Sequence, residues 1–282
     1  MVEKIIKELK ASLHDALFLD LDEFGLETEG GEVVSRFIGL KLHSAFQPIY
    51  NIAQGGKLLG YEALLRPAIG PDQISPPLAF DFADKQGRLV KLDRVARTLH
   101  MLNYLHLPEN RGLLFLNVHP KLLVSVNAHG KVFERVLHAH SVPTHQVVVE
   151  IQESAVDVDK QLSEAVGNYR DRAYRIAIDS FGGKHANLER LWRLAPDYVK
   201  LEPGLIREAE NNAKVRKVLA KLVEIAHELG AQAVIEGIEN ETQSRIAQDA
   251  GGTLLQGYHL GRPASSGEWL ARQPQADSKA AA

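Results

Sequence analysis

The chain has 282 residues, a formal net charge of −3 and no cysteine. Without cysteine, neither a disulfide framework nor a cysteine-ligated zinc site can form, and the small net charge gives no field that favours DNA or a membrane surface. No apolar run approaches the roughly 20 residues that span a bilayer, and the charged N-terminal segment is unlike a signal peptide. We therefore expect a cytoplasmic protein of one large domain or two small ones, with no membrane span and no DNA partner.

Residues 2–17 carry apolar side chains near helical spacing: Val2, Ile5, Ile6, Leu9, Leu13 and Leu17. With lysine and glutamate between them, they predict an amphipathic helix. This helix packs against its own domain or, alternatively, joins the chain to a partner subunit or an upstream module. Residues 20–32 are acidic and contain glycine, which is typical of a loop or linker. Residues 1–42 are accordingly assigned to an N-terminal helix and acidic linker.

The pattern changes at residue 43. Residues 45–52 and 58–65 are predicted to be strands, and the short segment Ala-Gln-Gly-Gly-Lys between them predicts a hairpin. Residues 70–77 contain three prolines and are predicted to be a loop. A helix is predicted to follow over residues 90–105.

Strands and helices then alternate. Strands are predicted over residues 113–118, 146–151, 175–178, 198–201, 233–235 and 254–258, with a helical stretch between each strand and the next. Alternation of this kind predicts a parallel sheet. So many units in about 240 residues favour a closed TIM-type (β/α)8 barrel over an open α/β sheet, and no glycine-rich dinucleotide fingerprint follows any strand. The barrel is assigned to residues 43–265, and residues 266–282 to a disordered tail.

Polar residues stand near the C-terminal ends of seven predicted strands: Glu62, Asn117, Glu150, Asp179, Lys200, Glu236 and Gln256. One buried acid at a strand end is more often a structural hydrogen-bonding group than a metal ligand. A barrel brings all seven ends to one face, where barrel enzymes build their active sites. Four carboxylates so close together favour a bound cation. Oxygen ligands without cysteine or histidine favour Mg²⁺ or Mn²⁺, which suit phosphoryl chemistry.

These residues lie in segments that resemble the EAL domain family, and the resemblance runs from about Ser44 to Pro263. The segments are Tyr61–Pro67 with Glu-Ala-Leu at 62–64, Leu116–Pro120, Val149–Ser154, Ile178–Gly182, Asp197–Lys200, Ile235–Glu239, and Gln256–Tyr258 followed by Gly261–Pro263. The resemblance implies a modified TIM barrel with one antiparallel strand. It also implies Mn²⁺- or Mg²⁺-dependent hydrolysis of cyclic di-GMP to linear pGpG.

The resemblance also implies roles for individual residues. Glu62, Asn117, Glu150 and Asp179 match the ligands of one metal, and Asp179 would bridge to a second metal that Glu236 also binds. Lys200 matches the lysine near the attacking water. Gln256 matches a glutamine that orders the site, and Glu153 a glutamate that braces the loop after Asp179. The positions that match ligand contacts are Gln47, Leu65, Arg66, Glu239 and Pro263, with the Arg66 guanidinium suited to a bidentate phosphate contact.

The sequence departs from the family pattern directly after Asp179. The family has two adjacent aspartates there, and this chain has Asp179-Ser180. Ser180 thus replaces an acidic ligand of the second metal with a neutral hydroxyl, which is a weaker ligand. Lys184 replaces the second glycine of the following Gly-x-Gly loop and brings a positive charge toward the second metal. One metal site is therefore expected to be intact and the second to be impaired.

Three functions follow from this pattern. The chain is a cyclic di-GMP receptor with weak or lost phosphodiesterase activity, or an active phosphodiesterase that tolerates Ser180, or an interaction module that binds neither metal nor nucleotide. The retained polar residues argue against the third. The family resemblance further implies a homodimer. Because the first 40 residues are too short for most sensory domains, an upstream sensory or signalling partner is a further expectation.

Overall fold

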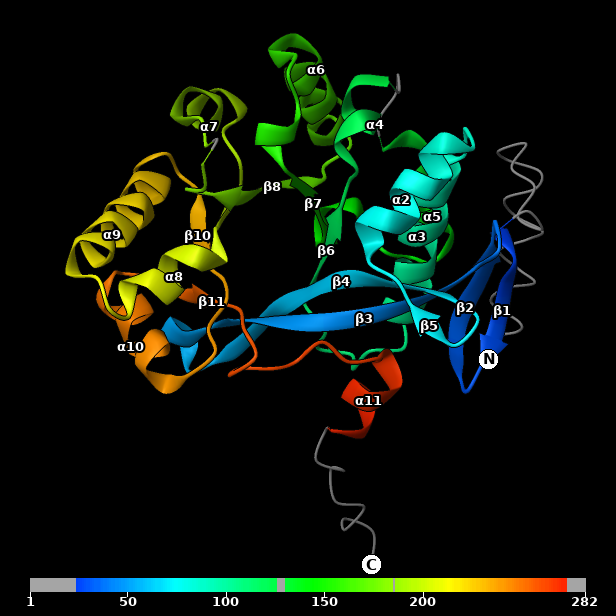
Figure 1. Cartoon of the computed structure of the whole chain (residues 1–282), viewed down its shortest axis with the longest axis horizontal. Coiled ribbons are helices and arrows are strands. Elements are labelled where there is room, and N and C mark those ends of the chain that lie inside the picture. Colours follow the sequence, from blue (N-terminus) through cyan, green and yellow to red (C-terminus); the bar gives the residue numbers. More distant parts are fainter. Residues whose placement is uncertain (1–23, 126–129, 185, 273–282) are drawn as a thin grey trace, which may run out of the picture.

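The computed structural model describes residues 24–125, 130–184 and 186–272, and the predicted helix over residues 2–17 lies outside them. Eight strands close into a barrel with helices around it (Figure 1). In their order around the barrel, the strands are β3 (Leu40–Asn51), β4 (Lys57–Ile69), β6 (Leu113–Asn117), β7 (Val147–Ile151), β8 (Arg175–Phe181), β9 (Tyr198–Leu201), β10 (Gln232–Ile235) and β11 (Leu254–Leu255). The predicted modified TIM barrel is therefore confirmed.

One barrel strand, β3, runs antiparallel to both of its neighbours, β4 and β11, whereas β4 and β6 to β11 pair in parallel. The predicted hairpin between β3 and β4 is the cause. Its turn is closed by the Asn51 side chain, which accepts a hydrogen bond from the Gln54 amide. Gly55 and Gly56 then take positive φ angles of 70° and 76°, which glycine adopts without steric cost.

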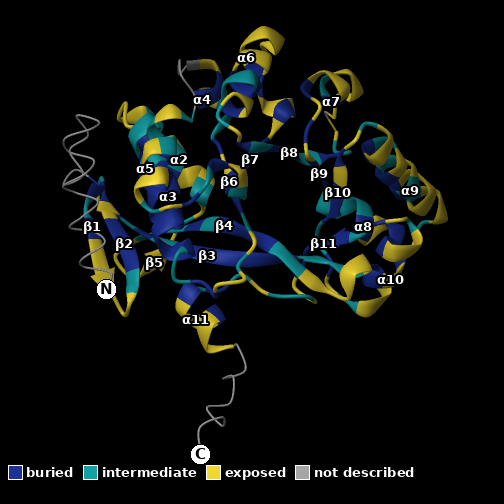
Figure 2. Ribbon diagram, turned by 180° about the vertical axis from the view of Figure 1, so that it is seen from behind, coloured by how far each residue is buried: buried dark blue, intermediate teal, exposed yellow. Residues whose placement is uncertain are grey.

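Helices cover the outside of the barrel, and their inner faces are buried against it (Figure 2). The α-helices are α2 (Pro76–Lys85), α3 (Leu89–Tyr104), α4 (Pro120–Ser125), α5 (Lys131–Ala139), α6 (Asp159–Arg170), α7 (Leu188–Leu194), α8 (Pro203–Ala209), α9 (Ala213–Glu228), α10 (Glu241–Asp249) and α11 (Ser266–Ala271). Short 3₁₀ turns lie at Ile52–Gln54, Thr144–Gln146 and Glu153–Ala155.

The loop predicted over residues 70–77 is wrong in part. It contains the short strand β5 (Asp72–Gln73) and the start of α2. The prolines at 76 and 77 begin that helix, because the first helical turn needs no backbone N–H donors. The Ser75 hydroxyl caps it by accepting a hydrogen bond from the Leu78 amide.

The loop or linker predicted over residues 20–32 is wrong over its described part, which begins at residue 24. Residues 26–37 form a hairpin of β1 (Leu26–Glu29) and β2 (Glu32–Phe37), which extends the sheet beyond β3. Its buried valines hold it in place, and the amide of Asn103 on α3 both accepts from Val33 N and donates to Val33 O. The domain thus begins before residue 43.

The disordered tail predicted from residue 266 contains an ordered helix, α11. The Ser265 hydroxyl caps the helix at the Glu268 amide, and the indole of Trp269 donates to the carbonyl of Phe46 at 2.7 Å. Trp269 also packs against Tyr61, with ring centroids 5.6 Å apart. These contacts join α11 to the barrel hairpin, so residues 266–271 are not part of a disordered tail.

The barrel interior is filled by one layer of apolar side chains from seven strands: Ile49, Phe115, Val148, Ala177, Tyr198, Val234 and Leu254. Side chains of a strand alternate between its two faces, so the residue two positions farther along points inward again. In the parallel strands β6 to β10 and after β11, that residue is polar: Asn117, Glu150, Asp179, Lys200, Glu236 and Gln256. In the antiparallel β3 it is the residue two positions earlier, Gln47.

Candidate metal centre

The polar layer above the barrel core surrounds one buried ammonium group. Lys200 is 1% exposed, and its Nζ lies 2.9 Å from Glu62 Oε2, 2.7 Å from Glu150 Oε1 and 2.9 Å from Glu236 Oε1. Asp179 Oδ1 is farther from it, at 3.9 Å. We call these four acids with Lys200 the carboxylate cluster. Five strands of the barrel each contribute one member, so the closed sheet fixes their relative positions.

Neutral amides complete the hydrogen bonds of Glu62. Asn117 Nδ2 donates to Glu62 Oε1 at 3.1 Å, and Gln256 Nε2 donates to Glu62 Oε2 at 2.7 Å. Gln256 Nε2 also lies 3.4 Å from Gln47 Oε1. Glu62 is thus the most fully satisfied acid of the cluster, because it accepts from two amides and from Lys200.

The electrostatics of the cluster follow from one buried cation among four acids. Burial raises the pKa of Glu150 well above its usual value, and the neighbouring Glu62 raises it further. Burial likewise raises the pKa of Glu236, to about 8. Burial would also raise the pKa of Glu62, but Lys200 and the amides lower it below the ordinary value. For Lys200, the carboxylates outweigh burial and raise its pKa well above normal.

The donor set fits a hard divalent cation. No three acids or histidines among the described residues already stand in a metal-holding arrangement, because the ammonium of Lys200 lies between the carboxylates. Yet one positive charge leaves the cluster with an excess of acid. Glu150 Oε2 is buried without a partner among the described residues, while Glu150 Oε1 meets Lys200 Nζ at 2.7 Å. Orphaned buried carboxylate oxygens are costly without a cation, and oxygen-only ligands suit Mg²⁺ or Mn²⁺.

Ser180 stands at a backbone irregularity. The register between β8 and β9 shifts between Ile178 and Phe181, and Ser180 takes the left-handed conformation with φ 55°. Its amide donates to Asp179 Oδ1 at 2.9 Å, and no hydrogen bond of its hydroxyl is found in the described part of the chain. Lys184 in the following loop is exposed. The second predicted metal position therefore has a neutral residue on the bulge, whereas Glu62, Asn117 and Glu150 of the first position lie on regularly paired strands.

Glu153 lies outside the cluster and holds the end of the loop that follows β8. It is 2% exposed, and its Oε1 accepts a hydrogen bond from the amide of Asn187, the N-cap of α7. Arg190 on α7 reaches Glu153 Oε2 at 3.3 Å and Asp159 at 2.7 Å. These contacts make Glu153 a positioning residue for the loop.

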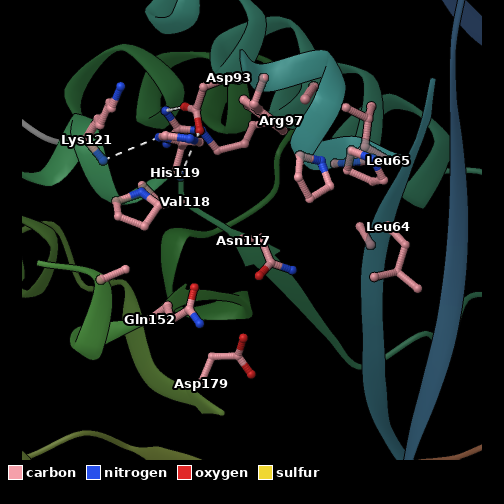
Figure 3. A pocket seen from close by; sticks show the side chains of 18 of the residues that line it. Leu64, Leu65, Asp93, Arg97, Asn117, Val118, His119, Lys121, Gln152 and Asp179 are labelled. Atoms are coloured by element: carbon pink, nitrogen blue, oxygen red, sulfur yellow. Dashed lines mark hydrogen bonds and ion pairs between the residues drawn. The ribbon is translucent and has the colours of Figure 1, made fainter. Parts of the chain in front are cut away.

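Two cavities flank the carboxylate cluster. The larger, of about 540 Å³, is lined by Leu65, Arg66, Asn117 and Asp179, and extends toward α2 and α3 (Figure 3). The smaller, of about 230 Å³, is lined by residues that include Gln47, Glu62, Glu236, Glu239 and Gln256. Of the predicted ligand contacts, Pro263 lines neither cavity.

The sequence interpretation missed the helical wall of the larger cavity. Asp93, Ala96, Arg97 and His100 of α3 line it, although none follows a strand. The spacing of Asp93 and Arg97, four residues apart, is a signal that they pair on one helix face, and their ion pair is buried. His119 also lines this cavity and stacks on Phe80 with centroids 5.2 Å apart.

The chain is similar to known proteins in sequence and in fold. Residues 34–263 match the EAL domain family. The chain is 29% identical over 245 residues to the probable cyclic di-GMP phosphodiesterase PdeN of Escherichia coli, a match that covers 83% of this chain and 46% of PdeN. It is 28% identical over 232 residues to the bifunctional diguanylate cyclase/cyclic di-GMP phosphodiesterase MucR of Pseudomonas aeruginosa, covering 78% and 33%. The chain spans about a third to a half of the length of these relatives.

Solved structures share the fold. The MucR phosphodiesterase in complex with cyclic di-GMP superposes with a TM-score of 0.69 at 25% identity, covering 80% of this chain and 93% of that one. BlrP1 of Klebsiella pneumoniae, with manganese and cyclic di-GMP, gives 0.70 at 26% identity and covers 80% and 56%. YkuI of Bacillus subtilis, with calcium and cyclic di-GMP, gives 0.68 at 27% identity and covers 79% and 56%.

In the described part of this chain, no helix is both long and apolar enough to cross a bilayer. The barrel with one antiparallel strand, the carboxylate cluster at its strand ends and the match over residues 34–263 agree with one another. The chain belongs to the EAL domain family, whose named relatives include cyclic di-GMP phosphodiesterases.

Proposed function

We propose that this chain binds cyclic di-GMP and hydrolyses it slowly or not at all. The observation that carries this proposal is the contrast at the end of β8. Asp179 reaches the carboxylate cluster, whereas the adjacent position, Ser180, is a neutral residue on a bulge. A site that keeps the acidic residues of the first metal position but lacks an acid at the second supports ligand binding better than hydrolysis.

Binding depends on groups that this chain keeps. Cyclic di-GMP carries two phosphates and two guanines, and the two cavities on either side of the cluster offer room for the two bases. Arg66 lines the larger cavity, as Asn117 does, and supplies a positive charge for a phosphate oxygen. Mg²⁺ or Mn²⁺ is the proposed cofactor, held by Glu62, Asn117, Glu150, Asp179 and Glu236.

Turnover needs more than binding. Divalent cations assist phosphodiester hydrolysis by neutralising the non-bridging oxygens and lowering the pKa of a water molecule. Around them, Lys200 would hold positive charge beside the reacting phosphate, while Gln256 and Asn117 fix the orientation of Glu62. Ser180 supplies no charge toward this task, and losing one electrostatic stabiliser commonly lowers kcat by about 10²- to 10³-fold.

The second candidate is an active phosphodiesterase that yields pGpG, and the intact cluster of four acids with Lys200 favours it. Product analysis after incubation of concentrated protein with cyclic di-GMP and Mn²⁺ separates the two. We expect little pGpG. Rapid formation of pGpG that disappears in Glu62→Ala would contradict the receptor proposal.

Calorimetry with cyclic di-GMP in Ca²⁺ tests binding itself. We expect a dissociation constant in the micromolar range or below. Heats indistinguishable from buffer would instead support the interaction-module hypothesis. The matched control is Glu27→Ala, an exposed acid on β1 outside both cavities, which we expect to leave binding unchanged.

The homodimer, the upstream partner and the cytoplasmic location stay predictions. One surface is a candidate for self-association: Leu188 and Trp192 of α7 are each about half exposed, at 47% and 54%, and line a hollow with Ile225 of α9. Burial of such side chains against a second copy would stabilise a dimer. Sedimentation velocity over a range of concentrations, with and without cyclic di-GMP, would measure it.

A further inference from the structure

His100 is a buried polar residue in the wall of the larger cavity. It lies on α3, is 5% exposed, and lines the cavity together with Ala96 and Arg97 of the same helix. Residues four apart share a helix face, which places His100 beside Ala96. His100 lies on a helix and not at the end of a barrel strand, so it is not part of the polar layer of the barrel.

A chain of hydrogen bonds favours one tautomer of His100. The amide orientation of Asn103 is set by Val33, whose N–H and carbonyl bind Asn103 Oδ1 and Nδ2 at 2.9 and 2.7 Å. Asn103 Nδ2 therefore donates to Ser44 Oγ, at 3.4 Å. Ser44 Oγ lies 2.8 Å from His100 Nδ1, and because this oxygen already accepts from Asn103, we infer that Ser44 donates its own hydrogen to Nδ1. Because Nδ1 accepts, the ring proton is on Nε2.

The same surroundings keep the imidazole neutral. Burial lowers the pKa of His100 to about 3, and the positive charge of Arg66 lowers it in the same direction. In the described part of the chain, no acceptor contacts Nε2. His100 thus offers the cavity one neutral, oriented N–H donor from a rigid helix.

The position of this donor favours a base over a phosphate. In Figure 3, Asp179 lies at one end of the cavity, while Arg97 and Asp93 of α3 lie at the opposite end, with Asn117 between them. A phosphate belongs at the end with the metal-binding groups. The walls near α2 and α3 are apolar and partly aromatic, with Leu65, Pro77, Phe80 and Ala96 among them, which suits the flat faces of a purine.

We propose that His100 donates from Nε2 to the Hoogsteen edge of one guanine of cyclic di-GMP. This edge carries two adjacent acceptors, N7 and O6. A neutral donor suits such an acceptor without the cost of burying a second charge. The assignment rests on the proposed function, because it names how the base is read within the same site, and it makes His100 a specificity-determining residue.

The affinity test compares wild type with His100→Phe, which keeps an aromatic ring and removes the donor. We expect cyclic di-GMP in Ca²⁺ to bind His100→Phe about tenfold more weakly, as for the loss of one buried hydrogen bond. Ser44→Ala frees the tautomer and is expected to weaken binding about threefold. His106→Phe, a half-buried histidine after α3 that lines neither cavity flanking the cluster, is the matched control and should bind as wild type does.

Ligand analogues test the contact without relying on a variant. In 7-deaza cyclic di-GMP the N7 acceptor is a carbon, and in cyclic di-AMP an amino group replaces O6. At least one analogue should bind wild type about tenfold more weakly than cyclic di-GMP does, and that difference should vanish in His100→Phe. Equal affinity of wild type and His100→Phe, or the same analogue preference in both, would overturn the assignment.

A direct readout is the imidazole spectrum of His100 by ¹H–¹⁵N NMR, assigned by its absence in His100→Phe. The free protein should show the Nε2–H tautomer, and cyclic di-GMP should shift that proton downfield. An unchanged resonance in saturated protein would refute the contact. Failure of wild type to bind cyclic di-GMP at all would refute the proposed function and, with it, this assignment.

Discussion

The two sides of the barrel mouth are built differently. On one side, Glu62 and Glu150 lie on regular strands, are 8% and 0% exposed, and are held by the register of β4, β6 and β7. On the other side, Asp179 and Ser180 lie at a bulge where the register of β8 is broken and one residue has a positive φ. Acids on regular strands have positions that the sheet determines, whereas a residue on a bulge also depends on its own backbone conformation.

The largest effect is expected from removing the cation of the cluster. Lys200→Met leaves four clustered acids without their buried partner, and should lower the free energy of unfolding without metal by about 3–5 kcal/mol. Urea denaturation in EDTA and in Ca²⁺ measures this, and Ca²⁺ should restore most of the loss. Lys41→Met, which breaks an ion pair with the exposed Glu29, is the control and should cost about 0–1 kcal/mol. Equal stability of Lys200→Met and wild type in EDTA would contradict the role of Lys200.

A substitution on the regular side tests the ligand set directly. Glu150→Gln keeps the shape of the side chain and removes an acid that is fully buried on β7. Because the loss falls on the intact side, we expect affinity for cyclic di-GMP in Ca²⁺ to fall by about 100-fold. Calorimetry measures it. Glu134→Gln on α5 removes a half-buried acid paired with Arg172 and should leave affinity unchanged; matching losses in both variants would point to general destabilisation.

A substitution on the irregular side should have the opposite sign. Ser180→Asp restores an acid at a left-handed position, where aspartate is better tolerated than most residues. We expect hydrolysis of cyclic di-GMP in Mn²⁺ to rise by about tenfold or more, since one electrostatic stabiliser is regained. Ser180→Asn suits the same backbone without the charge and should give no gain. If Ser180→Asp is no faster, the loop with Lys184 limits the rate.

The smallest effect is expected from His100, an ionisable residue on α3 that belongs to neither side of the barrel mouth. The pKa of His100 is lowered to about 3 by burial, so below its unfolded value of about 6.5 the unfolded chain binds the extra proton. Its contribution is therefore full above pH 6.5 and is lost as the pH falls. Between pH 6.5 and 5.5, wild type should lose about 1 kcal/mol of stability more than His100→Phe does. Parallel pH profiles of the two proteins would contradict the neutral, buried assignment.

Much of the fold could be predicted because it depends on local patterns. Short segments of the sequence determine both the alternation of strands and helices and the hairpin at Gly55 and Gly56. The β1–β2 hairpin was missed because its acidic surface residues resemble a linker, while its burial depends on Asn103, far along the chain. The helix α11 was missed for the same reason, since Trp269 packs on a distant hairpin.

Some features of the site could likewise be predicted from the sequence, and others could not. The polar residues at the strand ends were predictable, because a barrel must bring parallel strand ends together. The central place of Lys200 was not, because four acids and one lysine can pair in several ways until the geometry is known. His100 was beyond reach for another reason: nothing in its neighbours on α3 indicates that Ser44 and Arg66 will surround it.

The reversed direction of β3 has a mechanical consequence. This strand pairs with β2 over residues 40–42 and with β4 over residues 41–49 before its register shifts at Ile49 and Tyr50. Gln47, beside the carboxylate cluster, therefore sits on the same stiff ribbon as the N-terminal hairpin. A tilt or pull applied to that hairpin cannot be absorbed by a loop before it reaches Gln47.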